Sequence, residues 1–315
     1  MRFALEEHFV LDDPAHMGRW RTLVPHIPES KVTMLKKFLF DLGEDRIAAM
    51  TEARIDFAVL SNVATLQGQL DAATAMKLAR EANDRLAKAV QAHPRHFAGF
   101  ATVPLQDPDA GADEFERAVR DLGMKGAMII GQTGGSYLDD DRFAPFWERA
   151  QALDAPVYLH AADARIEPVT YAGRPELNGP TWSWTAETAA HTLRIIFGGV
   201  FNRFPQARLL LGHMGETLPF LLWRLDRRTQ AFSEVETIKP SMIFRRNVAI
   251  TTAGTFSDEP LGCALKALGE DSIMFSVDHP FEDMKEASNW LDAAPIADAV
   301  RDKISSGNAK RILKL

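Results

Sequence analysis

The sequence has 315 residues, of which 46% are hydrophobic and 25% charged, and its formal net charge at pH 7 is −7. This composition is typical of a soluble globular protein, and the negative charge argues against nucleic acid or an anionic membrane as the main partner. One cysteine, Cys263, excludes an internal disulfide, and no apolar run reaches the roughly 20 residues that span a bilayer. Without a signal-peptide pattern, we expect a cytoplasmic protein that forms one domain over residues 1–315.

Strands and helices are predicted to alternate along the chain. Short apolar strands are expected at about 3–11, 57–62, 97–104, 126–131, 156–160, 208–213, 248–252 and 273–278. Helices are expected at about 44–54, 70–92, 109–122, 141–153, 184–203, 217–231, 258–268, 284–292, 296–304 and 307–313. Strands that are apolar on both faces are typical of parallel sheets, and eight strand–helix repeats predict a (β/α)₈ TIM barrel. The alternative is a doubly wound open sheet, but no Gly-x-Gly-x-x-Gly motif follows the first strand.

Residues 12–40 interrupt this alternation. The stretch contains Pro14, Pro25 and Pro28 together with Trp20 and Phe38, and we expect it to be irregular. A long insertion directly after the first strand is predicted to be either a lid over a site or a contact between subunits.

Polar residues stand at the ends of four of the apolar strands. Glu6 and His8 share one face of the first strand, because alternate side chains of a strand point the same way. His160, His213 and Asp278 end the fifth, sixth and eighth strands. A single histidine in such a place is more often a satisfied core group, and Glu6 and Glu7 alone could belong to an exposed edge strand. Five such residues on converging strands instead predict a site at the C-terminal end of the barrel.

Four of these residues form a ligand set. Glu6, His8, His160 and Asp278 supply two carboxylates and two imidazoles, which suits one borderline divalent cation such as Mn²⁺ or Zn²⁺. No organic cofactor is predicted.

Motifs along nearly the whole chain extend this interpretation. They are Ala4-Leu5-Glu6-Glu7-His8-Phe9, Leu105-Gln106-Asp107-Pro108, Tyr158-Leu159-His160, Gly179-Pro180-Thr181-Trp182, Leu211-Gly212-His213-Met214-Gly215-Glu216, Leu222-Trp223-Arg224-Leu225-Asp226 and Phe275-Ser276-Val277-Asp278. In these motifs the chain resembles the amidohydrolase superfamily, in the branch of metal-dependent, non-oxidative benzoate decarboxylases. The resemblance implies loss of CO₂ from an ortho-hydroxybenzoate such as 2,6-dihydroxybenzoate.

The resemblance also implies roles for individual residues. The ligand set would hold the metal, and Asp278 would in addition be the acid that protonates the ring. His213 and Glu216 resemble the family's active-site pair, and Arg224 matches a position associated with the substrate carboxylate. A small aromatic carboxylate is the implied partner, and a homodimer or homotetramer the implied assembly.

Two other functions are weighed against decarboxylation. A mononuclear hydrolase of the lactonase type, in the same superfamily, would use His213 to activate a metal-bound water. Binuclear hydrolases of the superfamily carry a His-x-His motif in the first strand and a carboxylated Lys at the end of the fourth strand. In this sequence Glu6 stands in place of the first His, and the fourth strand ends Ile129-Ile130-Gly131, without a Lys. A non-catalytic metal-binding protein would have a closed site, against which the predicted pair at 213 and 216 argues.

Overall fold

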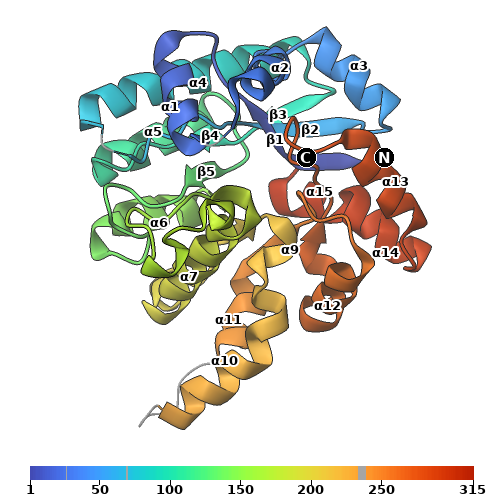
Figure 1. Ribbon diagram of the computed structural model, residues 1–315. Coiled ribbons are helices and arrows are strands. Elements are labelled where there is room, and N and C mark those ends of the chain that lie inside the picture. The colour runs from blue at the N-terminus through green and yellow to red at the C-terminus, as the bar shows by residue number, and fades with distance from the viewer. Residues whose placement is uncertain (26, 69, 233–238) are drawn as a thin grey trace.

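The structure, a computed structural model, describes residues 1–25, 27–68, 70–232 and 239–315. The strands are β1 (Phe3–Phe9), β2 (Phe57–Asn62), β3 (Phe97–Gly99), β4 (Ala101–Thr102), β5 (Ala127–Ile130), β6 (Val157–His160), β7 (Leu209–Leu211), β8 (Val248–Thr251) and β9 (Ile273–Met274). The helices surround them (Figure 1), and over the described residues none has the length and apolarity that crossing a membrane requires.

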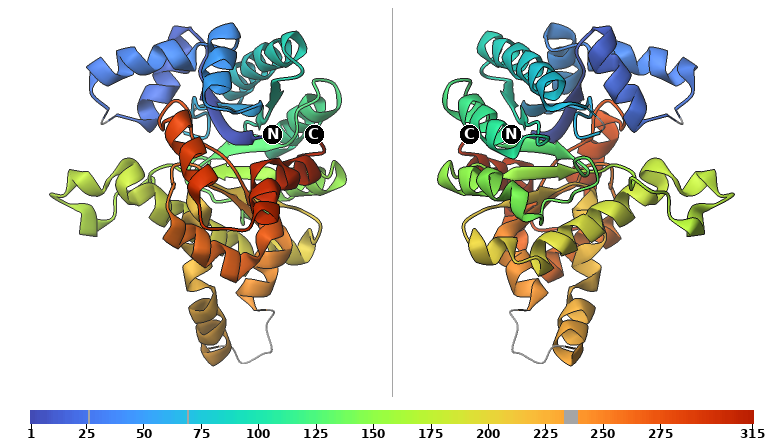
Figure 2. Two further views of the ribbon diagram at one scale, coloured as in Figure 1. Left: turned by 90° about the vertical axis from the view of Figure 1, so that its right-hand side faces the viewer. Right: turned by 90° about the vertical axis from the view of Figure 1, so that its left-hand side faces the viewer.

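The α-helices are α1 (Pro14–Leu23), α2 (Glu29–Leu39), α3 (Glu44–Glu52), α4 (Ala72–Ala92), α5 (Pro108–Arg120), α6 (Ala144–Ala152), α7 (Ser183–Phe197), α8 (Val200–Arg203), α9 (His213–Glu216), α10 (Leu218–Phe232), α11 (Pro240–Asn247), α12 (Asp258–Leu268), α13 (Met284–Ala293), α14 (Asp298–Asp302) and α15 (Asn308–Leu313). Shorter helical turns are η1 (Asp141–Phe143), η2 (Val169–Tyr171), η3 (Pro175–Leu177), η4 (Gly179–Thr181), η5 (Glu270–Ser272) and the π-helical η6 (Lys303–Gly307). The loop after β6, which carries η2 to η4, projects from the body of the molecule (yellow-green in Figure 2).

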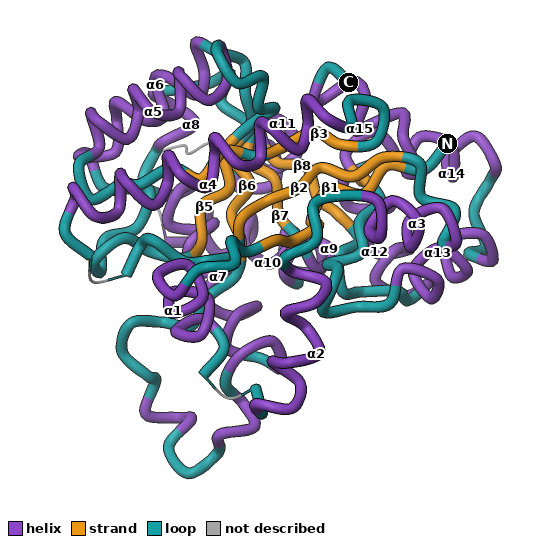
Figure 3. Tube along the Cα trace, turned by 90° about the horizontal axis from the view of Figure 1, so that it is seen from above, coloured by secondary structure: helices purple, strands orange, loops and turns teal. Residues whose placement is uncertain are grey.

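All strands run parallel, in the orders β1-β2-β3 and β4-β5-β6-β7-β8-β9. Backbone hydrogen bonds join these two sheets at both edges. The amide of Phe100, between β3 and β4, donates to the carbonyl of Leu60 (2.9 Å). The amide of His8 donates to the carbonyl of His279 (2.7 Å), and the amide of Asp278 donates to that of Glu6 (3.0 Å). The strands therefore form the predicted TIM-barrel arrangement, seen from above in Figure 3.

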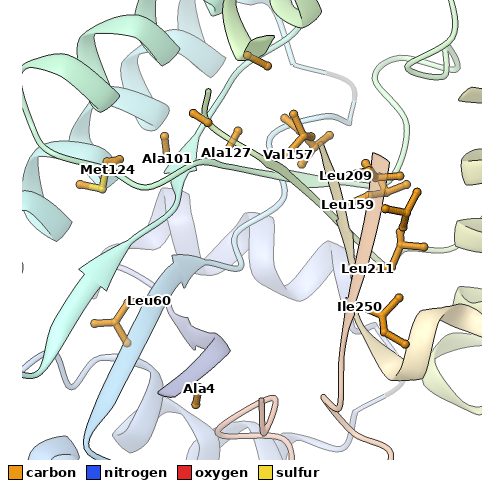
Figure 4. Packing of buried hydrophobic residues seen from close by; sticks show 14 of the residues in the cluster. Ala4, Leu60, Ala101, Met124, Ala127, Val157, Leu159, Leu209, Leu211 and Ile250 are labelled. Carbon is orange, nitrogen blue, oxygen red and sulfur yellow. The ribbon is translucent and has the colours of Figure 1, made fainter. Parts of the chain in front are cut away.

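Buried strand residues divide between two hydrophobic clusters. In β6, Val157 and Leu159 pack outward with the helices, as do Leu209 and Leu211 of β7 (Figure 4). Tyr158 belongs instead to a second cluster, which fills the barrel interior. Such alternation within fully buried strands explains why their sequences are apolar throughout.

Some predicted boundaries were wrong. The strand expected at 97–104 is divided at Phe100, where pairing passes from β2 to β5, and the last strand ends at Met274, four residues earlier than predicted. Helix α11 was not predicted, although Pro240 stands at its first position, where a missing amide proton costs nothing.

The expectation of irregular structure at 12–40 was also wrong, because this stretch forms α1 and α2. Pro14 begins α1 instead of interrupting it, since the Asp13 carboxylate caps the amides of Ala15 and His16. The side chains of Trp20, Leu23, Val32, Leu35 and Leu39 pack into the second cluster.

Asn83 of α4 connects this helix to the barrel strand β4 and to helix α5. Its amide donates to the Thr102 carbonyl (3.0 Å) and the Glu114 carboxylate (2.9 Å), and its side-chain oxygen accepts from the Thr102 amide (2.8 Å). Asn83→Ala removes all three hydrogen bonds, although Arg117 still pairs with the Glu114 carboxylate, and we expect it to lower the free energy of unfolding by about 2–4 kcal/mol. Urea denaturation measures the change. Asp84→Ala, which removes the partly exposed Arg117–Asp84 ion pair, should cost at most about 0.5 kcal/mol; equal losses would contradict this role of Asn83.

Candidate metal centre and active site

The four predicted ligands come together at the C-terminal end of the barrel. Glu6 and His8 extend from β1, His160 from the end of β6, and Asp278 from the segment after β9. One potential ligand atom from each lies within 4.8 Å of the others. His8 Nε2 lies 3.0 Å from Asp278 Oδ1, and His160 Nε2 lies 3.6 Å from Glu6 Oε1.

A β-bulge in β1 directs Glu6 into the barrel. The pairing register of β1 with β2 shifts between Ala4 and Glu7, and the Ser276 hydroxyl accepts hydrogen bonds from the amides of both Leu5 (3.1 Å) and Glu6 (2.6 Å). Leu5 and Glu6 therefore both face inward, whereas the Glu7 carboxylate accepts from the Val277 amide (3.0 Å). Bulges commonly redirect side chains in this way beside active sites.

Hydrogen bonds on the far side of each imidazole orient the two histidines. His8 Nδ1 lies 3.1 Å from the Ser61 hydroxyl, and His160 Nδ1 lies 2.8 Å from the Ala161 carbonyl. Nε2 of each ring is left facing the cluster, an arrangement common for histidines that bind metal. Burial and the nearby charge of His8 lower the pKa of His160 to about 3, so the ring is neutral, as a ligand must be.

Tyr158 holds Glu6 Oε2, the carboxylate oxygen of Glu6 that is not directed at His160. Its hydroxyl donates to Glu6 Oε2 and lies 2.8 Å from the Thr251 hydroxyl. Gly212 leaves room for this carboxylate, because a Cβ atom there would lie 2.5 Å from Glu6 Oε2. Tyr158 was not predicted from the sequence, although it lies two residues before His160 and so shares its face of β6.

The cluster has the chemistry of a metal site. Glu6 Oε1, His8 Nε2 and Asp278 Oδ1 are buried and none makes a hydrogen bond, although such atoms are costly without a partner. Burial also raises the pKa of Glu6 to about 7. A divalent cation would give these atoms a partner, so the residues present fit one Mn²⁺ or Zn²⁺.

His213 and Glu216 form a pair on the turn after β7. His213 Nδ1 lies 2.7 Å from Glu216 Oε1, and its Nε2 lies 3.6 Å from Asp278 Oδ2. The residues from His213 to Thr217 all have positive φ, so the chain makes a left-handed turn directly after β7. Burial works against a positive charge, but the carboxylates of Glu216, Glu6 and Asp278 outweigh it and raise the pKa of His213 well above its usual value.

Asp278 connects the pair to the ligand cluster. Its Oδ1 faces His8 and its Oδ2 faces His213, and these two imidazoles overcome the effect of burial and lower the pKa of Asp278. Its backbone φ is +84°, a strained conformation for a residue with a side chain, of the kind found at functional sites. The site thus has a carboxylate with one oxygen toward the ligand cluster and the other toward His213.

Arg224 is not brought to this cluster within the chain. Its side chain is exposed on α10, which projects from the barrel (Figure 1), and with Trp223 and Arg227 it lines a separate hollow of about 430 Å³. A cavity of about 420 Å³ adjoins the predicted ligands and is lined by His160, Asp278 and Trp184, whereas Arg224 is not among its lining residues in the described ranges.

Comparison with known proteins agrees with this geometry. The model of the amidohydrolase family matches residues 39–315. The gamma-resorcylate decarboxylase of Rhodococcus jostii (strain RHA1) is 39% identical, and the alignment covers 100% of this chain and 98% of that protein.

Two solved structures are similar over their whole length. A 2,6-dihydroxybenzoate decarboxylase complexed with 2,6-dihydroxybenzoate has 37% identity and a TM-score of 0.91, with 100% of this chain and 99% of that one covered. A dihydroxybenzoic acid decarboxylase from Polaromonas sp. JS666, with bound manganese and the inhibitor 2-nitroresorcinol, has 36% identity and a TM-score of 0.92, with 100% and 97% covered. With sequence motifs, barrel and full-length likeness in agreement, this chain belongs to the amidohydrolase family, in the branch that contains the gamma-resorcylate decarboxylases.

Proposed function

We propose that this chain is a metal-dependent, non-oxidative decarboxylase of ortho-hydroxybenzoates, with 2,6-dihydroxybenzoate as the first substrate to test. The observation that carries the proposal is the position of Asp278, between the ligand cluster and the His213–Glu216 pair. This arrangement suits a reaction in which an anionic substrate is held on one side and a proton is delivered from the other. The full-length likeness to decarboxylases supports the same chemistry.

Glu6, His8, His160 and Asp278 are the proposed ligands of one Mn²⁺ or Zn²⁺. When bound, the cation would fix the orientation of the substrate's carboxylate and phenolate oxygens and neutralise their charge. Tyr158 and Ser61 would keep the Glu6 carboxylate and the His8 ring in place.

Proton transfer is assigned to Asp278 and the pair beside it. Asp278 would donate a proton to the ring carbon that bears the carboxylate, and His213 Nε2, 3.6 Å from Asp278 Oδ2, would supply it. The Glu216 carboxylate holds the ring of His213 and favours its protonated form. The carbon–carbon bond then breaks, its electron pair restores the aromatic ring, and CO₂ leaves, so no oxidant or reductant is required.

The role of Arg224 as a substrate-binding residue stays a prediction. Because its side chain is exposed on α10, away from the cavity of its own chain, it could meet a substrate carboxylate only in the site of a second copy. The homodimer or homotetramer expected from the resemblance would provide such a neighbour.

The adjacent carboxylates Glu6 and Glu7 offer a matched test of the metal centre. Glu6→Gln removes a charged ligand, and we expect the purified variant to retain far less than the roughly one equivalent of Mn²⁺ or Zn²⁺ expected for the unmodified chain. Glu7→Gln should retain the metal, because Glu7 accepts from the Val277 amide instead of facing the cluster. Elemental analysis of both variants measures the content, and equal retention would show that Glu6 is not a ligand.

Replacement of His213 separates proton transfer from metal binding. His213→Asn keeps the four ligands, so metal content should be unchanged while kcat falls by about 10²–10⁴-fold. His93→Asn is the control, since His93 follows α4 directly before β3 and lies at the opposite end of the barrel strands. A His213→Asn variant with unchanged turnover would make His213 a structural residue.

Isotope labelling distinguishes decarboxylation from hydrolysis. In D₂O, 2,6-dihydroxybenzoate should release CO₂ and leave one deuterium on the ring carbon that carried the carboxylate, as read by NMR and mass spectrometry. High bicarbonate should drive the reverse carboxylation. If a panel of ortho-hydroxybenzoates gives no CO₂ while lactones or simple esters are cleaved with uptake of solvent oxygen, the chain is a hydrolase instead.

A further inference from the structure

One side of the cavity beside the ligand cluster is built from the segment that contains α1 and α2. Among the lining residues that the structure describes, seven of fifteen lie within residues 23–35. Six of them are apolar, and they are Leu23, Val24, Ile27, Pro28, Met34 and Leu35. The match of the family model begins at residue 39, after this wall, whereas the full-length relatives align over the wall as well.

The wall is fixed to the barrel. The imidazole of His16, in α1, is buried between the Asp13 carboxylate (2.7 Å) and the Leu78 carbonyl (3.1 Å). At the other end of the segment, the buried guanidinium of Arg46 donates to the carbonyls of both Phe38 and His8 (2.7 Å each). Together with the buried side chains of α1 and α2, these bonds make the segment a preformed surface, so the interpretation of this stretch as a lid is not favoured.

Charged groups among the described lining residues of the cavity are found at the ligand end and at the mouth. Apart from the ligands His160 and Asp278, the charged lining residues within the described ranges are Lys31 and Glu282, and both are exposed. Between these two ends the described residues of the α1–α2 wall present apolar side chains, including Val24, which is 2% exposed. The buried indole nitrogen of Trp184, which lines the cavity but is not part of this wall, has no hydrogen-bond partner. A hydroxyl group pressed against this wall would lose its water without gaining a hydrogen-bond partner.

From these observations we infer that the α1–α2 wall selects hydroxybenzoates that carry an alkyl group, in place of a further hydroxyl, on the ring edge remote from the carboxylate. The inference rests on the proposed function, in which the carboxylate and its ortho oxygen face the ligand cluster. Carbons 4 and 5 of the ring then lie farthest from the ligands, against the rest of the lining.

A matched pair of substrates tests the inference. Methyl and hydroxyl groups are close in size, and position 5 is meta to the reacting carbon, which keeps the electronic effect of the substituent small. We expect kcat/KM for 5-methylsalicylate to exceed that for 2,5-dihydroxybenzoate by about 10–100-fold. The product phenols, 4-methylphenol and hydroquinone, should show the same order of affinity in calorimetric titrations of the metal-loaded protein, which do not depend on turnover.

Three variants assign the preference to the wall. Met34→Gln adds an amide to an exposed side chain of the wall, so folding should not be affected, and Val24→Thr adds a hydroxyl of nearly the same shape. Both should lower the methyl-to-hydroxyl ratio at least several-fold, and any electronic effect of the substituent cancels in this comparison. Val32→Thr is the control, because Val32 lies in the same segment but packs into the core and does not line the cavity.

The outcomes distinguish failure of the proposed function from failure of the inference about the wall. If neither salicylate nor any substituted ortho-hydroxybenzoate loses CO₂, the proposed function fails, and this inference fails with it. If these acids react but 2,5-dihydroxybenzoate is used as well as 5-methylsalicylate, or if the ratio is unchanged in both Met34→Gln and Val24→Thr, the wall does not determine specificity.

Discussion

The contact between the first strand and the segment after the last one is the constraint on which the site depends. Two backbone hydrogen bonds, from His8 to His279 and from Asp278 to Glu6, bring residues some 270 positions apart in the chain into one cluster. The same bonds join the edges of the barrel. The fold and the ligand geometry therefore share one set of interactions, and a change that opens this seam would affect both.

Gathering several buried carboxylates in one site is electrostatically unfavourable, and the three carboxylates Glu6, Glu7 and Asp278 are therefore stabilised in different ways. Glu6 and Asp278 each present one oxygen to the cluster, while the second oxygen is held by Tyr158 in one case and faces His213 in the other. Glu7, also fully buried, is turned away toward the Val277 amide, and burial raises its pKa to about 8. It is therefore mostly neutral at pH 7 and adds little to the concentration of negative charge beside the ligands.

The barrel and the ligand cluster could be predicted because both depend on local patterns. Apolar strands that end in Glu, His or Asp indicate which side chains lie at the C-terminal rim. The helices α1 and α2 were missed because Pro14 and Pro28 were interpreted as breaks, whereas proline is also favoured at a helix start. The location of Arg224 could not be predicted, since it depends on the direction in which α10 leaves the barrel. The bulge in β1 was also hidden, because it is fixed by Ser276, far away in the sequence.

That bulge has a consequence for how this protein can vary. Two glutamates stand side by side in β1, and only the extra residue of the bulge determines which of them faces the barrel interior. Inserting or deleting a single residue in this strand would exchange their positions and turn His8 to the opposite face as well. The number of residues between Ala4 and Phe9 is therefore not free to change while the cluster is retained.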